Sequence, residues 1–421
     1  MPDEPEACPE CGGGLVRPPH DWPTWCRTCE WNLDAFAPPT RRKATGLDRF
    51  SHHIGYRLDK ETLAELTAAP PPRPKVTVAK VFLAIVSLVL AACTVIGIIG
   101  GLMLMFGDHM YWARILGFFL LLLSLEIRPR WPQSEVEVGA VERTSAPELY
   151  RLVDEIADRI GAPHIHTIVL DSDWNASCRR SGLRRRPILT LGLPFWSALS
   201  PAARLALLGH ELGHLVNGDP TQRLLTQPAL TTFARLANVF DPRRRVPRGG
   251  QRILVFSWAG AMFSGFVFAP VWFVARWINF GLRMVAARDH QRAEIYADAV
   301  GLQLGGDAGA AELLDALLFD DELLTAVRRS SARGEDPEQW RVHAAEARTL
   351  AAKRRAIEVQ HSLRIEASLF SSHPPTGMRI RLVDAWPAEP ATDLLTPERS
   401  RRVDASLAEP YRRTRRALAH S

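Results

Sequence analysis

The pattern of apolar residues first predicts a membrane hairpin near the N-terminal third of the chain. Residues 81–106 contain no charged side chain and exceed the ~20 residues that a bilayer-spanning helix needs. A second apolar run, residues 110–125, follows a short polar turn and opens with Tyr111 and Trp112, residues favoured at membrane interfaces. This run is shorter and contains Arg114, so a buried soluble helix is the alternative for it.

Two later segments are also apolar, and they leave the number of membrane spans at two or four. Residues 221–240 form a weak segment that Arg235 interrupts, whereas residues 253–275 lack charge and include Pro270, within a mostly apolar segment of residues 253–280. Basic residues flank the outer ends of the first hairpin and are absent from its turn, which indicates that both flanks are cytoplasmic: Arg73, Lys75, Lys80, Arg128 and Arg130.

The remaining periodicity predicts a mainly α fold with a small β-sheet. Residues 136–141, 165–170 and 187–191 have strand patterns, and residues 147–161 form an amphipathic helix. Residues 171–186 are polar and rich in arginine. Residues 308–370 are charged and helical, and a last helix covers residues 380–386. The arginine-rich tail from Glu398 is expected to be solvated or disordered, with weak attraction to a membrane or nucleic acid as the alternative.

Composition adds a metal site at the N-terminus. The chain has 421 residues, a formal net charge of +6 and six cysteines, four of which form two CxxC pairs: Cys8, Cys11, Cys26 and Cys29. This spacing predicts a four-thiolate zinc ribbon in residues 1–36, with two disulfides as the alternative. Residues 37–75 are expected to be a proline-rich linker with one short helix at residues 59–68, and with His52 and His53 in solvent.

A second candidate metal site lies in the helix predicted over residues 200–218. Ser200 and Pro201 suit a helix start, and Asn217-Gly218 suits its end. His210 and His214 are four residues apart and therefore share one helix face, where two imidazoles can hold one metal ion. Glu211 is rotated by about 100° from His210 and can act as a base without being a ligand. This H-E-x-x-H arrangement is typical of zinc proteases, and a chance occurrence is the alternative.

A catalytic zinc ion needs a third protein ligand, and a carboxylate is a usual one. Residues 290–301 are helical in pattern, with Glu294 and Asp298 one turn apart. We expect Glu294 to be the ligand and Asp298 to accept the free N–H of a ligand histidine, with a surface carboxylate pair as the alternative. Because His214 and Glu294 would bind one ion, the chain must cross the membrane an even number of times between them.

These motifs together resemble the HtpX-like membrane zinc metallopeptidases, which are related to the CAAX prenyl endopeptidases. The resemblance covers roughly residues 76–386 and rests on HELGH, Glu294-x-x-x-Asp298 and Ser372-His373-Pro374-Pro375 behind a two-span hairpin. It implies a gluzincin-like α+β domain with His210, His214 and Glu294 as zinc ligands and Glu211 as general base. It further implies that Asp298 supports a ligand, that His373 donates to the transition-state oxyanion, and that Arg379 supports His373.

The sequence departs from that family in three places. Ala203-Arg204 stands where an acidic residue is common, Ala293 precedes Glu294 in place of arginine, and residues 221–240 are less apolar than a third span. The ribbon lies outside the resemblance. The expected domains are therefore a ribbon (1–36), a linker (37–75), a hairpin (76–130), a metallopeptidase domain (131–390, including 221–240 and 253–280) and a basic tail (391–421).

The sequence thus predicts an integral membrane zinc endopeptidase with its catalytic domain and ribbon in the cytoplasm. It would hold one catalytic and one structural zinc ion, act on protein or peptide substrates and contact membrane lipid. An extended substrate could pair with a strand edge near residues 171–177. The partner of the ribbon is not identified, and nucleic acid is not expected. The alternatives are a CAAX-type prenyl-protein endopeptidase and an inactive membrane-tethered zinc-ribbon binding protein.

Overall fold

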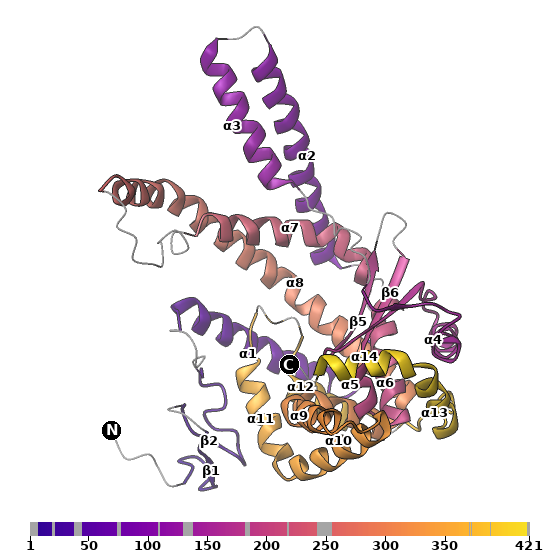
Figure 1. The fold of residues 1–421 in the computed structure, drawn as a ribbon. Coiled ribbons are helices and arrows are strands. Elements are labelled where there is room, and N and C mark those ends of the chain that lie inside the picture. Colours follow the sequence, from indigo (N-terminus) through magenta and orange to yellow (C-terminus); the bar gives the residue numbers. More distant parts are fainter. Residues whose placement is uncertain are drawn as a thin grey trace. The chain divides into compact units, whose positions relative to one another are not determined.

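The structure, a computed structural model, divides the chain into two compact units (Figure 1). The first contains residues 1–75, 133–220 and 290–421, and the second contains residues 76–132 and 221–289. The described residues are 7–18, 22–37, 44–73, 77–107, 110–128, 138–181, 186–216, 219–241, 255–369, 371, 373–387 and 389–418.

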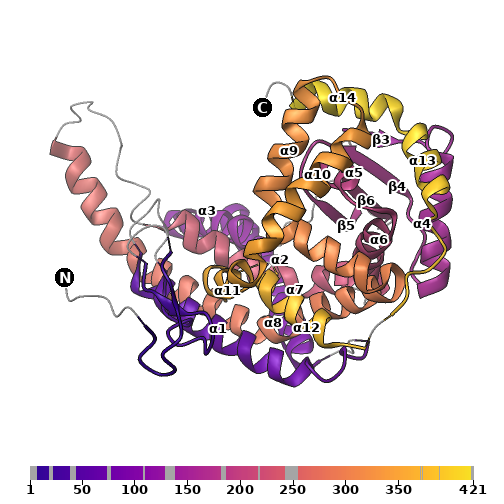
Figure 2. The same cartoon turned by 90° about the horizontal axis from the view of Figure 1, so that it is seen from below.

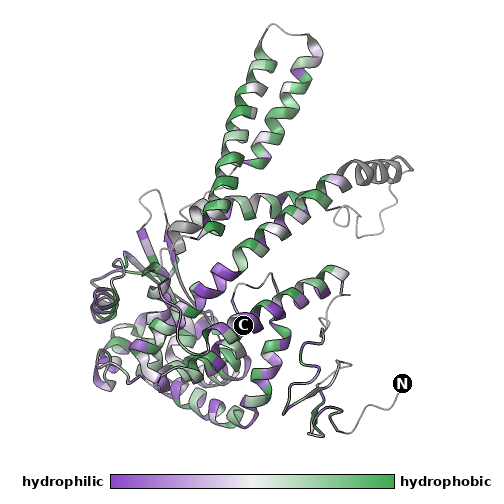
Figure 3. Cartoon of the chain, turned by 180° about the vertical axis from the view of Figure 1, so that it is seen from behind, coloured by the Kyte–Doolittle hydropathy of each residue, from purple (hydrophilic) through white to green (hydrophobic). Residues whose placement is uncertain are grey.

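The second unit contains the predicted hairpin. Its helices are α2 (Val78–Phe106) and α3 (Tyr111–Ile127), and both are strongly hydrophobic over most of their length (Figure 3). Gly101 and Gly117 let them pack closely, because a Cβ atom at Gly101 would lie 2.9 Å from the carbonyl oxygen of Gly117. Among the described residues, α2 is the one helix long and apolar enough to cross a membrane.

Two further helices complete the second unit. They are α7 (Asp219–Val239) and the first part of α8 (Val255–Leu318). Leu83 of α2, Ala229 of α7 and Leu282 of α8 form a small buried cluster, and the Ser87 hydroxyl accepts a hydrogen bond from the Ala229 N–H at 3.0 Å. The arginine-rich segment between α7 and α8, on which the choice between two and four spans depends, lies outside the described residues.

The first unit contains a four-stranded sheet in the order β3-β4-β6-β5. The strands are β3 (Ala140–Val141), β4 (Thr167–Asp171), β5 (Ala176–Ser181) and β6 (Arg186–Gly192). β4 and β6 are parallel, whereas β3 and β5 are antiparallel to their neighbours. The predicted strands correspond to β3, β4 and β6, although residues 136 and 137 lie outside the described part. β5 falls in the arginine-rich segment and was not predicted.

Further helices belong to the same unit. They are α4 (Pro147–Ile160), α5 (Leu193–Ala198), α6 (Pro201–Val216), α9 (Asp320–Ala332), α10 (Pro337–Ala351), α11 (Arg355–Ile365), α12 (Thr376–Ala385), α13 (Pro397–Ser406) and α14 (Ala408–Leu418). In Figure 2 the strands lie inside a ring that includes α4, α9, α13 and α14. α4 shows how the ring is held, because Leu149, Leu152 and Ile156 repeat at helical spacing and are fully buried. The mainly α fold with a small sheet is therefore confirmed.

The C-terminal tail is folded, contrary to the expected solvated or disordered end. α13 and α14 contribute Val403, Leu407 and Tyr411 to the same buried core as α4 and the sheet. The tail is basic because its outer face carries arginines such as Arg401 and Arg412, which are exposed. The expectation was wrong because it considered only the arginines of the outer face and not the apolar residues between them, which are buried.

The N-terminal region also differs from the expected linker. Residues 15–16 (β1, Leu15–Val16) pair with residues 25–26 (β2, Trp25–Cys26), and they are followed by α1 (Gly46–Leu66). This helix starts earlier than the expected short helix because Thr45 and Asp48 form a capping box. His52 is buried and its Nε2 lies 2.9 Å from the carbonyl oxygen of Arg364, so the expectation of a solvated His52 is wrong.

Candidate active site

The site is built where α6 packs closely on the second half of α8. Glycines on the contact face allow this approach: a Cβ atom at Gly213 would lie 3.2 Å from the Ala297 Cα, and one at Gly209 would lie 3.0 Å from the Gly301 Cα. Glu294 and Asp298 of α8 can therefore reach the face of α6 that carries the histidines. The helix predicted over residues 200–218 is observed as α6, and the predicted helix at residues 290–301 is part of α8.

Three predicted ligands converge at this contact. The Glu294 carboxylate lies 3.8 Å from His210 Nε2 and 3.7 Å from His214 Nε2, measured to its two different oxygens. These distances are too long for direct hydrogen bonds. They suit atoms that share a tetrahedral zinc ion, whose bonds to nitrogen and oxygen are ~2 Å. All three side chains are buried, and their donor set fits zinc.

Asp298 lies one turn beyond Glu294 and orients the first histidine. Its Oδ1 is 2.9 Å from His210 Nδ1, which leaves Nε2 of His210 to face Glu294. Arg379 of α12 donates two hydrogen bonds to the same carboxylate, at 2.8 and 2.6 Å. Burial alone would raise the pKa of Asp298, but the charge of Arg379 outweighs burial and lowers this pKa to about 2. Asp298 is therefore ionised throughout the physiological range.

His373 lies beside the ligand set, from the segment between α11 and α12. Its Nδ1 is 2.7 Å from Glu294 Oε2, while more than half of its side chain is exposed. Burial works against ionisation of Glu294, yet the adjacent imidazoles of His214 and His373 hold its pKa well below the usual range. Arg379 contacts Asp298, and no hydrogen bond joins it to His373 among the described residues, so its support reaches His210 through Asp298.

Glu211 is buried on α6 and faces the sheet edge. Burial raises the pKa of the Cys178 thiol on β5, and the nearby negative charge of Glu211 raises this pKa further. β5 is the outer strand of the sheet, so Glu211 lies near the edge of the sheet. The sequence predicts a strand edge near residues 171–177 but not the bounds of β5, because Cys178 lies among arginines without strand-like alternation.

The four cysteines also come together, in the ribbon. Their sulfur atoms lie within 4.8 Å of one another, with 3.5 Å between Cys8 and Cys29 and 3.5 Å between Cys11 and Cys26. A disulfide requires ~2.05 Å, and all four residues are free thiols. The backbone N–H of Cys29 and of Thr28 point at the Cys26 sulfur and help to lower its pKa to about 6. The cluster suits tetrahedral zinc–thiolate binding.

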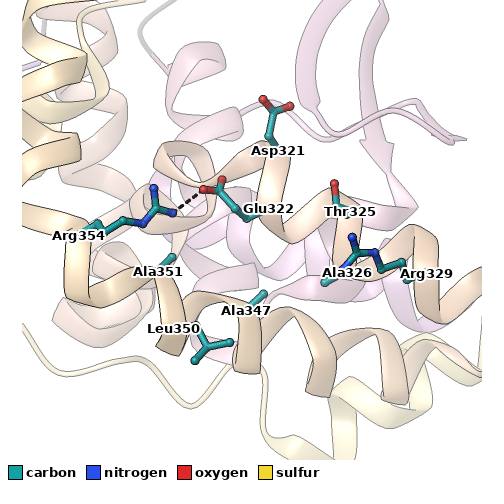
Figure 4. Close-up of a pocket in the computed structure, with 9 residues that line it drawn as sticks. All are labelled: Asp321, Glu322, Thr325, Ala326, Arg329, Ala347, Leu350, Ala351 and Arg354. Atoms are coloured by element: carbon teal, nitrogen blue, oxygen red, sulfur yellow. Dashed lines mark hydrogen bonds and ion pairs between the residues drawn. The ribbon is translucent and has the colours of Figure 1, made fainter. Parts of the chain in front are cut away.

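A groove of about 540 Å³ lies between α9 and α10, with the Glu322–Arg354 ion pair at one end (Figure 4). Its lining includes Thr325, Arg329 and Leu350 and none of the candidate metal ligands. We assign no role in the chemistry to it.

Two histidines one turn apart and a carboxylate from a second helix form the ligand set of HExxH zinc metallopeptidases, and the glutamate between the histidines completes the motif. A model of peptidase family M48 matches residues 143–387, which is more than half of the chain. The chain belongs to peptidase family M48, and the resemblance found in the sequence is confirmed.

Curated relatives carry a more specific name. The chain is 33% identical over 193 residues to "Protease HtpX" of Chromohalobacter salexigens, which covers 44% of this chain and 53% of that protein. It is 31% identical over 147 residues to a "Protease HtpX homolog" of Methanothermobacter thermautotrophicus, covering 33% of this chain and 54% of the relative. A homolog of Pyrobaculum islandicum is 25% identical over 292 residues, covering 65% of this chain and 77% of the relative.

The chain thus spans about half the length of the first two relatives. No solved structure matches it.

Proposed function

We propose that this protein is a membrane-bound zinc endopeptidase that hydrolyses peptide bonds of protein substrates on the cytoplasmic side. The convergence of His210, His214 and Glu294 on one point, with Glu211 directly after His210 in the sequence, carries the proposal. Membership of family M48 and the names of the HtpX relatives support it.

The residues have distinct roles in this proposal. His210, His214 and Glu294 would hold a zinc ion, which supplies Lewis-acid polarisation of the scissile carbonyl and acidifies a water molecule. Glu211 accepts the proton of the attacking water and returns it to the leaving amine. Asp298 fixes the ring of His210, and Arg379 keeps Asp298 ionised. His373 orients Glu294 through its hydrogen bond, and its exposed edge is free to donate to the oxyanion of the transition state.

The edge strand β5 supports binding of an extended substrate. It is the last strand in the order β3-β4-β6-β5, where an extended peptide could add by backbone pairing, and it passes close to Glu211 through Cys178. A peptide bound there would lie beside the base.

α2 is the basis for the proposed attachment to the membrane. The basic residues that flank the hairpin are the basis for placing the catalytic domain in the cytoplasm. α2 is long and apolar enough to cross a membrane, and only 22% of its most apolar stretch is buried. The basic residues outside the hairpin, together with four free thiols that require a reducing compartment, favour the cytoplasm for both flanks.

The test compares Glu211→Gln with the wild-type full chain in detergent, using casein as substrate. This substitution removes the base and retains the volume and every ligand, so cleavage should fall at least about 100-fold while zinc content stays unchanged. Glu322→Gln, which changes an exposed glutamate in the α9–α10 groove, is the matched control and should cleave normally. Cleavage by Glu211→Gln at the wild-type rate would reject the mechanism.

A further inference from the structure

The zinc ribbon is built into the same compact unit as the candidate active site. Trp25 of β2 is 1% exposed, and its indole N–H donates to the Gln360 side-chain oxygen of α11 at 3.0 Å. The Gln360 amide donates back to the Arg27 carbonyl at 2.9 Å. Trp25 and Leu33 belong to one buried cluster with residues of α11 and α12. The ribbon is therefore seated on these two helices.

Arg364, near the end of α11, is the strongest link. It is fully buried, and its guanidinium donates to the carbonyl oxygens of Ala35 at 2.7 Å and Pro23 at 2.6 Å. The same group lies over the Trp25 ring, 5.4 Å from its centroid. The Arg364 carbonyl in turn contacts His52 of α1. One residue thus joins the ribbon, α1 and α11.

The chain beyond Arg364 is held at both ends. Glu366 accepts hydrogen bonds from the Thr376 N–H at 2.7 Å and from its hydroxyl at 3.1 Å, which ties the end of α11 to the start of α12. The Ser362 hydroxyl accepts from the Gly377 N–H at 2.8 Å. These contacts close the segment between α11 and α12 into a loop with a fixed base.

α1 supports the same loop from a third side. The Leu369 N–H donates to the Ser51 carbonyl at 3.4 Å. A Cβ atom at Gly55 would lie 2.8 Å from the Ser368 backbone nitrogen, so only glycine permits this approach. α1 and α11 therefore hold the loop directly, the ribbon is joined to both through Arg364, and the loop carries His373 to Glu294.

We propose that the metal-loaded ribbon positions His373 against Glu294, with Arg364 as the positioning residue, and so tunes the site proposed above. The ribbon has strands of only two residues each and little apolar surface of its own, so its shape depends on metal bound by the four cysteines. Loss of that metal releases the carbonyls that Arg364 holds, and the loop then holds His373 less firmly.

The test measures metal affinity of the His210–His214–Glu294 site by competition with a chelator, together with kcat and KM. Cys11→Ser should lose the ribbon zinc, lower the affinity of the remaining site about tenfold and reduce kcat by a similar factor, with KM little changed. Arg364→Met keeps all four thiols and should act in the same direction. Cys93→Ser and Arg354→Met, changes to an exposed cysteine and an exposed arginine elsewhere, should resemble the wild type.

A double substitution separates positioning from general destabilisation. In a His373→Ala background, Cys11→Ser should cause no further loss of affinity or kcat, because both changes act on one interaction. Unchanged affinity in Cys11→Ser, or an equal further loss in the His373→Ala background, would overturn the inference. Wild-type cleavage by Glu211→Gln would reject only the proposed function, because the affinity measurement tests the ribbon independently of catalysis.

Discussion

The two ends of the chain are attached to the metallopeptidase domain through buried arginines in opposite electrostatic settings. Arg204 of α6 is fully buried and forms a 2.9 Å ion pair with Asp404 of α13. Arg364 is equally buried, but it donates to backbone carbonyls, and no carboxylate among the described residues forms an ion pair with it. Burial accordingly lowers the pKa of Arg364.

The acidic groups at the two attachments differ in the same way. Burial opposes ionisation of Asp404, but Arg204 and Arg341 outweigh it and lower its pKa. Asp59 of α1 is buried without a basic partner among the described residues, and burial raises its pKa to about 7. The C-terminal helices are thus held by buried ion pairs, in which Asp404 binds Arg204 and Arg341. The N-terminal attachment includes the ion pair of Glu30 with Arg381, but burial disfavours the charged forms of Arg364 and Asp59, which makes it the more easily released of the two.

The largest expected effect is that of Asp404→Asn. This change preserves shape but leaves Arg204 and Arg341 without their shared carboxylate, which should destabilise the first unit by roughly 3 kcal/mol. Thermal unfolding in detergent measures the effect. Asp384→Asn, at a half-exposed carboxylate that pairs with Arg355, is the control and should change stability by less than about 1 kcal/mol. Equal effects of the two changes would remove the distinction between the attachments.

An effect of similar size should appear as a pH dependence that comes from Asp59. Its folded-state pKa of about 7 lies above its unfolded value, so the folded state binds the extra proton and stability falls as pH rises from about 4 to 7. We expect a loss of roughly 3 kcal/mol over this range, and Asp59→Asn should flatten the profile. Asp404, whose pKa is lowered, should lose its contribution only at more acidic pH. An unchanged profile in Asp59→Asn would contradict this assignment.

The smallest effect on global stability should come from Arg364→Met. It removes two hydrogen bonds to carbonyls but also removes a buried charge that has no ion-pair partner among the described residues, so the net loss should be about 1 kcal/mol. The change should instead be local, with faster amide hydrogen exchange in β2 and the start of α1. A loss as large as that of Asp404→Asn would show that the ribbon is fixed as firmly as the C-terminal helices.

The candidate active site could be predicted because its chemistry is local in sequence. His210 and His214 share a helix face through their spacing, and Glu294 with Asp298 repeats the same geometry on a second helix. Long apolar runs likewise predicted α2 and α3. These signals depend on helical periodicity, which a single sequence displays directly.

The attachments could not be predicted, because their partners are distant and leave no local pattern. Arg204 and Asp404 belong to segments that each look like an ordinary helix surface or a basic tail. Arg364 binds main-chain carbonyls, which every residue possesses, so no partner residue marks the contact. β5 was missed because arginines interrupt its apolar alternation, although Ala176 and Cys178 face the core.

The most direct test of the whole account is a zinc analysis of the purified full chain and two variants. The account predicts two zinc ions per wild-type chain, one after Cys11→Ser, and loss of the other ion together with proteolysis in Glu294→Ala. A wild-type chain with a single zinc ion, or a Glu294→Ala protein that retains two and still cleaves casein, would contradict the account.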